Sequence, residues 1–97
     1  MMELTPNSLI TKNENVLSAC LDGEIVIMDE KTGEYKAYND TASRIWQIME
    51  ERKEITFADI CAILKSEYDV PMKTCEKESA IFITKMVQEN VFTMEEN

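Results

Sequence analysis

The stretch TGEYKAYNDTASRIW, residues 32–46, decides the fold because its periodicity changes at Asn39. Before that residue, residues 34–38 have the pattern of a short β-strand, and after it the apolar residues recur at the spacing of an amphipathic helix. Asn39 or Asp40 is the expected N-cap of this helix, since either side chain can accept a hydrogen bond from a free backbone amide. The strand is short and half polar, which raises the question of what pairs with its outer edge.

Two more strands are predicted upstream of this junction. The runs VLSACL (residues 16–21) and EIVIM (residues 24–28) consist mostly of β-favouring residues. Asp22 and Gly23 between them are a strong signal for a type I′ hairpin turn. The sequence therefore predicts a three-stranded antiparallel meander, with residues 16–21 and 34–38 as its edge strands.

The flanks of the meander are turns and polar sequence. A second turn is expected at DEKTG, residues 29–33. Residues 1–15 are mostly polar and contain Pro6, so we expect an extended arm or a loose first strand there. The predicted organisation is an N-terminal arm, residues 1–15, followed by a single domain, residues 16–94.

Three helices are expected after the meander. The second begins at Thr56, with Asp59 as a weaker form of the capping-box partner, and ends before Pro71. The third runs from about residue 74 to residue 89, with Asn90 as a left-handed C-cap and VFTM folding back. The expected core faces of the three helices are Ala42, Ile45, Trp46 and Met49; Phe57, Ile60, Cys61, Leu64 and Tyr68; and Cys75, Ser79, Phe82, Ile83, Met86 and Val87.

Ile81 does not belong to the core face of the third helix. At 100° per residue it projects almost opposite the core stripe, among Lys77, Thr84, Lys85 and Gln88. Lone exposed apolar residues are common and need no explanation. The alternative is that Ile81 is the apolar contact in a groove used by a partner.

The composition excludes several classes of function. A chain of 97 residues is one domain, and its net charge of -9 argues against binding to nucleic acid. No apolar run is long enough to span a membrane and no signal peptide precedes the domain, so a cytoplasmic location is expected. Cys20, Cys61 and Cys75 are odd in number and widely spaced, which favours reduced, buried thiols.

No set of catalytic or metal-binding residues is evident. The chain has no histidine, and its cysteines lack the spacing of a zinc site. Gly23 and Gly33 both belong to expected turns, so there is no glycine-rich phosphate loop. We therefore expect a protein that is not an enzyme and that has no cofactor and no metal.

The order of these features resembles the PqqD-like family, small peptide-recognition proteins or domains from pathways for ribosomally made, modified peptides. The resemblance covers about residues 16–93 and is densest in LDGEIVIMDEKTGEYKAYNDTASRIWQIM, residues 21–49. Two departures are chemically tolerable: Tyr38 stands where Leu is usual, and Asn90 where Gly is usual. The residues that carry the pattern are Tyr38, Asn39, Ala42, Trp46, ITFADICAILKSEYDV (residues 55–70) and residues 86–92.

The resemblance implies an α+β, winged-helix-like fold that recognises the leader segment of a precursor peptide. In that family the leader adds as a further strand beside the third strand and lies in a groove against the third helix, a mode in which main-chain hydrogen bonds supply affinity. A stand-alone chain with EYDV after the second helix looks most like the version from lasso-peptide clusters, which works beside a leader peptidase and a cyclase. The expected peptide-binding residues are Glu34, Tyr35, Lys36, Ala37, Tyr38, Lys77, Ile81, Thr84 and Lys85.

Within the third strand, the side chains alternate between two faces. We expect Tyr38 to be mainly in the core and Tyr35 to be more available to a ligand. Without the resemblance, an ordinary solvated edge strand would be the favoured interpretation of residues 34–38.

Other classes of function remain open from the sequence. A DNA-binding winged helix has the same architecture, but the third helix has no arginine and a net negative charge. A subunit that binds an enzyme rather than a peptide is a further alternative, and it is compatible with leader binding. The partner enzyme, the precursor peptide and the oligomeric state, monomer or strand-swapped dimer, are not determined by the sequence.

Overall fold

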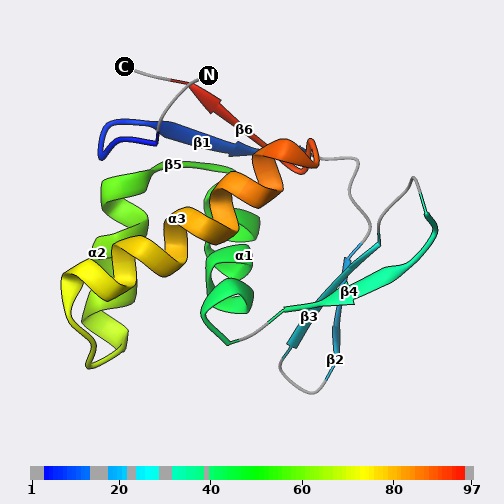
Figure 1. Cartoon of the computed structure of the whole chain (residues 1–97), viewed down its shortest axis with the longest axis horizontal. Coiled ribbons are helices and arrows are strands. Elements are labelled where there is room, and N and C mark those ends of the chain that lie inside the picture. Colours follow the sequence, from blue (N-terminus) through cyan, green and yellow to red (C-terminus); the bar gives the residue numbers. More distant parts are fainter. Residues whose placement is uncertain (1–3, 14–17, 22–23, 29–31, 39, 96–97) are drawn as a thin grey trace.

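The computed structural model describes residues 4–13, 18–21, 24–28, 32–38 and 40–95. Within these residues there are two small antiparallel sheets and three helices, with one sheet above the helices and the other beside them (Figure 1). The elements in chain order are β1 (Leu9–Lys12), β2 (Ser18–Leu21), β3 (Glu24–Met28), β4 (Tyr35–Ala37), α1 (Asp40–Arg52), β5 (Glu54–Thr56), α2 (Phe57–Glu67), α3 (Met72–Gln88) and β6 (Phe92–Glu95).

The first sheet is the predicted meander, with strand order β2-β3-β4 and antiparallel pairing throughout. Its register places Val26 opposite both Ala19 on β2 and Ala37 on β4. The assigned strand β4 is shorter than the expected residues 34–38. The N–H of Tyr38 nevertheless extends the ladder by donating to the Ile25 carbonyl at 3.1 Å.

Four expectations fall wholly or partly outside the described residues. They are the first two residues of the predicted strand 16–21, the Asp22–Gly23 turn, most of the 29–33 turn and the role of Asn39 as an N-cap.

The helix ends follow the expected capping chemistry. The Thr56 hydroxyl accepts a hydrogen bond from the Asp59 N–H at 3.2 Å, which caps α2 as predicted. Helix α3 begins at Met72, earlier than expected, because Pro71 has an extended conformation that suits the N-cap position. At the other end Asn90 is left-handed, with φ 63°, which confirms the predicted C-cap region.

Two backbone hydrogen bonds complete the C-terminal cap of α3. The Asn90 N–H donates to the Val87 carbonyl at 3.1 Å, and the Val91 N–H donates to the Met86 carbonyl at 2.9 Å. This pair of bonds is the Schellman arrangement, which satisfies carbonyl groups that the helix itself leaves free. The chain then turns back along the helix into β6, as VFTM was expected to do.

The second sheet was not predicted. Its order is β5-β1-β6, so β1 is paired on both sides. Ile10 lies opposite Ile55 and Met94 in these pairings and is 0% exposed. Of the two options left open for residues 1–15, the structure has a first strand, and it is built into the same hydrophobic core as the helices. Ile10 of this strand therefore shares a hydrophobic core with residues of the predicted domain, residues 16–94.

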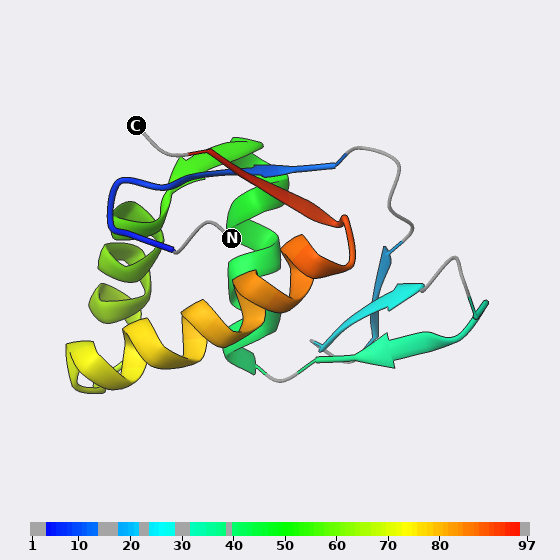
Figure 2. The same ribbon diagram turned by 45° about the horizontal axis from the view of Figure 1, so that its top comes forward.

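Both sheets and all three helices contribute to one core. Trp46 of α1 stacks near Phe92 of β6 with ring centroids 5.8 Å apart, and Phe82 of α3 meets Phe92 edge-on at 6.0 Å. Ile25 and Ile27 of β3 belong to the same buried cluster. The core faces predicted for the helices are confirmed, with Tyr68 and Val87 at the margin. Figure 2 shows α1 below the β5-β1-β6 sheet and beside the β2-β3-β4 sheet, with α3 crossing it.

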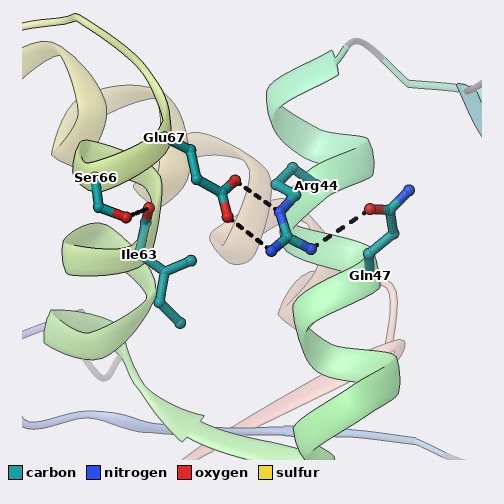
Figure 3. A network of polar contacts seen from close by, with 5 residues as sticks. All are labelled: Arg44, Gln47, Ile63, Ser66 and Glu67. Atoms are coloured by element: carbon teal, nitrogen blue, oxygen red, sulfur yellow. Dashed lines mark hydrogen bonds and ion pairs between the residues drawn. The ribbon is translucent and has the colours of Figure 1, made fainter.

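A charged clamp ties α1 to α2 (Figure 3). The Arg44 guanidinium donates to both carboxylate oxygens of Glu67, at 2.7 and 2.8 Å, and weakly to the Gln47 side chain at 3.5 Å. On α2 the Ser66 hydroxyl donates to the Ile63 carbonyl at 2.7 Å. The hydrogen bond with Arg44 lowers the pKa of Glu67 below its usual value.

Glu67→Gln is expected to lower the free energy of unfolding at pH 7 by about 0.2–1 kcal/mol, the range for exposed ion pairs. Because Arg44 lowers the pKa of Glu67, the pair contributes fully above about pH 4.3 and its contribution is lost as the pH falls through the lowered pKa. Urea unfolding curves at pH 7 and at acid pH measure this difference. Glu54→Gln removes the same charge away from the clamp and serves as the control; a mutant deficit that persists in acid would contradict the prediction.

Candidate functional site

An open groove lies between β4 and α3, with a volume of about 670 Å³. Its walls come from three elements: the edge strand β4, the first turn of α1 and the middle of α3. The groove is lined by Lys36, Ala37, Tyr38, Thr41, Ala42, Glu78, Ile81, Phe82 and Lys85.

Strand β4 forms one wall, and its outer edge is unpaired among the described strands. The Tyr38 N–H points inward, to the Ile25 carbonyl of β3. Because successive N–H groups of a strand point to opposite sides, the N–H of Ala37 points away from β3, towards the free edge. The edge therefore presents backbone donors and acceptors beside the groove.

One hydroxyl group fixes β4 to the helices. The buried Ser43 side chain accepts a hydrogen bond from the Ile25 N–H at 2.9 Å and donates to the Tyr38 carbonyl at 3.3 Å. An antiparallel pair would normally join this N–H and this carbonyl directly. Ser43 stands between them, so one of the two hydrogen bonds that would join Ile25 and Tyr38 passes through a side chain of α1, while the other is direct. This arrangement holds the edge strand at a set position relative to α1.

Three contacts connect β4 and the following residue, Tyr38, to α3 and its C-cap residue, Glu89. The Tyr38 ring meets the Phe82 ring edge-on, with centroids 5.3 Å apart, and Lys85 Nζ lies 5.7 Å from the centroid of the Tyr38 ring. Lys36 Nζ forms an ion pair with Glu89 Oε1 at 3.0 Å. Residue 36 thus lies near residue 89 and residue 38 near residue 82, so β4 and α3 run in opposite directions along the groove.

The described residues hold no group of three or more His, Cys, Asp and Glu side chains that could bind a metal. Cys61 and Cys75 are free and buried as expected, and burial raises the pKa of the Cys61 thiol to about 12. A thiol with so high a pKa stays protonated and is a poor nucleophile. The side chain of Cys20 lies outside the described residues.

In the described part of the chain, no helix is long and apolar enough to cross a bilayer.

The family described as coenzyme PQQ synthesis protein D (PqqD) matches residues 24–91, from β3 to the residue after the left-handed Asn90. The chain belongs to the PqqD family. That match contains every residue that lines the groove. Among curated proteins, none matches the chain.

Two solved structures are similar to this PqqD-family chain over most of its length. One is TbiB1 in complex with the TbiA(beta) leader peptide, at 26% identity and a TM-score of 0.73, covering 86% of this chain and 94% of that one. The other is a lasso peptide synthetase B1 complexed with the leader peptide, at 30% identity and a TM-score of 0.67, with the same two coverages. The α+β, winged-helix-like fold predicted from the sequence is confirmed.

The groove brings together part of the predicted binding set of this PqqD-family chain. Lys36, Ala37, Tyr38, Ile81 and Lys85 line it. Ile81 is 63% exposed, which confirms the helix phase read from the sequence. Tyr38 packs against the core, whereas the Tyr35 side chain is 64% exposed, in agreement with their expected order of burial.

Four predicted residues do not line the groove: Glu34, Tyr35, Lys77 and Thr84. The two on α3 are displaced for a geometric reason. At 100° per residue, Lys77 and Thr84 lie on the far side of Ile81 from Glu78, Phe82 and Lys85. The groove follows the side of α3 that faces β4, whereas the predicted site was centred on Ile81.

Four lining residues were missed as binding candidates: Thr41, Ala42, Glu78 and Phe82. Ala42 and Phe82 were assigned to the core, and they are indeed buried; they form the floor of the groove. Glu78 precedes Phe82 by one helical turn and follows the predicted binding residue Lys77 directly in the sequence. Its spacing to Ile81 and Lys85 is the signal that could have identified it.

Proposed function

We propose that this chain binds the leader segment of a ribosomally synthesised precursor peptide without chemical turnover. The leader pairs with the free edge of β4 as an added strand and places side chains in the groove against α3. The observation that carries this proposal is the outer edge of β4, with which no described strand pairs, beside a groove that is apolar along its floor. A strand addition of this kind draws affinity from main-chain hydrogen bonds and specificity from side-chain pockets.

The two similar structures support the proposal, since each contains a B1 protein with a leader peptide. We propose that the pathway is of the lasso-peptide type, and that the bound leader is delivered in the cytoplasm to a leader peptidase or another modifying enzyme. The net charge of -9 disfavours nucleic acid as the ligand and would steer a lysine-bearing leader towards the protein.

The first test is a fluorescence-anisotropy titration with labelled leader peptides taken from short reading frames beside the gene. Saturable binding of one leader, with no binding of a scrambled version, is the expected result. Random duplex DNA is included at low and high salt, because salt-dependent binding to it would favour the winged-helix DNA-binding alternative. If no neighbouring leader binds, the proposed function is wrong.

Ile81→Asp is expected to weaken leader binding about tenfold, because it removes about 1–2 kcal/mol of apolar burial from the groove. The melting temperature should hardly change, since Ile81 is 63% exposed in the free protein and surface substitutions usually cost within about 0.5 kcal/mol. Met72→Asp is the matched control, because Met72 is an exposed apolar residue of the same helix outside the groove. Equal effects of the two substitutions on affinity would contradict the proposed position of the peptide.

A further inference from the structure

The charges along the groove are unevenly distributed. Of the residues that line it, Glu78 is the carboxylate, whereas Lys36 and Lys85 are the two cations. Because β4 and α3 run in opposite directions, the two cations lie towards the Glu89 end, where Lys36 pairs with Glu89. Glu78 lies about two turns of α3 before Lys85, at the other end of the groove. The groove therefore has an acidic end and a basic end.

The two ends of the groove also differ in whether their charged side chains interact with other residues of the chain. Lys36 is held by Glu89 at 3.0 Å, and the Lys85 ammonium lies over the Tyr38 ring. Among the residues that the structure describes, the Glu78 carboxylate makes no ion pair or hydrogen bond. An exposed glutamate is by itself ordinary surface. Glu78 differs from Glu76, the other glutamate of α3, because it lies on a groove wall, one turn from the floor residue Phe82.

We propose that Glu78 selects a lysine or arginine in the bound peptide and that this pairing sets the direction in which the peptide lies. This inference rests on the proposed function and adds a requirement for the bound peptide: a basic residue at the position that meets Glu78. A peptide lying in the opposite direction would bring its basic side chain to the end where Lys36 and Lys85 outnumber the Glu89 carboxylate, and the excess positive charge would repel it. Direction matters because the backbone groups of a strand edge alone would accept a peptide in either orientation.

The geometry sets the spacing of the peptide side chains. Glu78 and Lys85 are separated by about 10 Å along the helix axis, at 1.5 Å per residue. Side chains on one face of an extended peptide repeat about every 7 Å. The basic residue at Glu78 and the peptide side chain nearest Lys85 are therefore about two to four residues apart, with the apolar residue that meets Ile81 and Phe82 between them or beside them.

The test uses displayed random peptides of about ten residues, a length in the upper range of natural strands. Peptides are selected in parallel on the wild-type chain, on Glu78→Gln and on Glu76→Gln. Glu76 is the matched control, because it is an exposed glutamate of the same helix that does not line the groove. We expect a basic residue at one fixed position in peptides selected on the wild type and on Glu76→Gln, and no such enrichment on Glu78→Gln.

Anisotropy with one selected peptide then measures the pairing directly. Replacing its conserved lysine by glutamine should weaken binding to the wild type about two- to fivefold, the range for exposed ion pairs, and leave binding to Glu78→Gln unchanged. Glu78→Lys combined with a lysine-to-glutamate peptide should recover affinity that either change alone loses. Both variants are surface changes, and circular dichroism confirms their folding.

The outcomes separate this inference from the function on which it rests. If the wild type and Glu78→Gln select peptides with the same basic position, the role of Glu78 is wrong while peptide binding stands. If the wild type selects no peptides and binds no leader, the proposed function itself is wrong.

Discussion

Ala37→Pro is expected to weaken leader binding by roughly 30- to 700-fold while leaving the domain folded. The N–H of Ala37 points to the free edge of β4, where the proposed peptide strand would accept its hydrogen bond. Proline removes that donor and leaves a carbonyl of the peptide without a partner, at a cost of about 2–4 kcal/mol. Proline is tolerated at edge strands because the lost N–H belongs to no ladder within the protein.

The control for this substitution lies on the opposite edge of the same sheet. Strand β2 is the other edge strand, and Ser18 is its first residue. Because Val26 turns its backbone groups towards Ala19, the N–H of Ser18 faces outward, as that of Ala37 does. Ser18→Pro should therefore keep full affinity. A folded Ala37→Pro protein with the affinity of the wild type would show that the peptide does not pair with β4 in the proposed register.

Ile10→Ala is expected to lower the free energy of unfolding by about 2–5 kcal/mol, the range for truncating a fully buried aliphatic side chain. Ile10 is 0% exposed and lies in the central strand of the β5-β1-β6 sheet. Urea denaturation followed by the fluorescence of Trp46, the single tryptophan, measures the change.

Thr11→Ala is the control for Ile10→Ala, since Thr11 lies on the other face of β1, and it should cost only about 0.5 kcal/mol. Identical unfolding curves for Ile10→Ala and the wild type would mean that residues 1–15 are an arm outside the core. The expected large difference would show that the first strand contributes to the stability of the whole domain.

Features that depend on one segment of chain could be predicted from the sequence. The Thr56 cap and the left-handed Asn90 follow from residues that act on their own backbone neighbours. The change from strand β4 to helix α1 follows from the change in apolar periodicity between residues 32 and 46. The exposure of Ile81 follows in the same way from its position on α3. Each of these features is local, and the structure has each of them.

The second sheet could not be predicted because its pairing joins distant segments. The strands β1, β5 and β6 have three or four residues each, too few for a period to be recognised. Their partners lie more than 40 residues away in the sequence. Nothing in LITK, EIT or FTME alone indicates that these segments meet.

The residues of the candidate site likewise include some that local patterns predict and others that only tertiary packing brings to the groove. The strand and Ile81 were found from local patterns, whereas Glu78 and Thr41 belong to the groove only because of the angle at which α3 passes β4. That angle is set by the packing of Phe82 against Tyr38 and Phe92 in the core. A tertiary contact of this kind cannot be predicted from the phase of one helix. The predicted site therefore included Lys77 and Thr84, which lie on the other side of Ile81 from the groove.

The pairing of β1 with β6 has a consequence for how the chain is made. Leu9 of β1 lies opposite Glu95 of β6. Strand β1 therefore cannot pair with β6 until almost every described residue has been synthesised. A contact between such distant residues requires closure of a long loop, which slows folding relative to structure built from local contacts. On the ribosome, the hairpin of β3 and β4 can form early, but the sheet that contains Ile10 cannot be completed until residue 95 has left the exit tunnel.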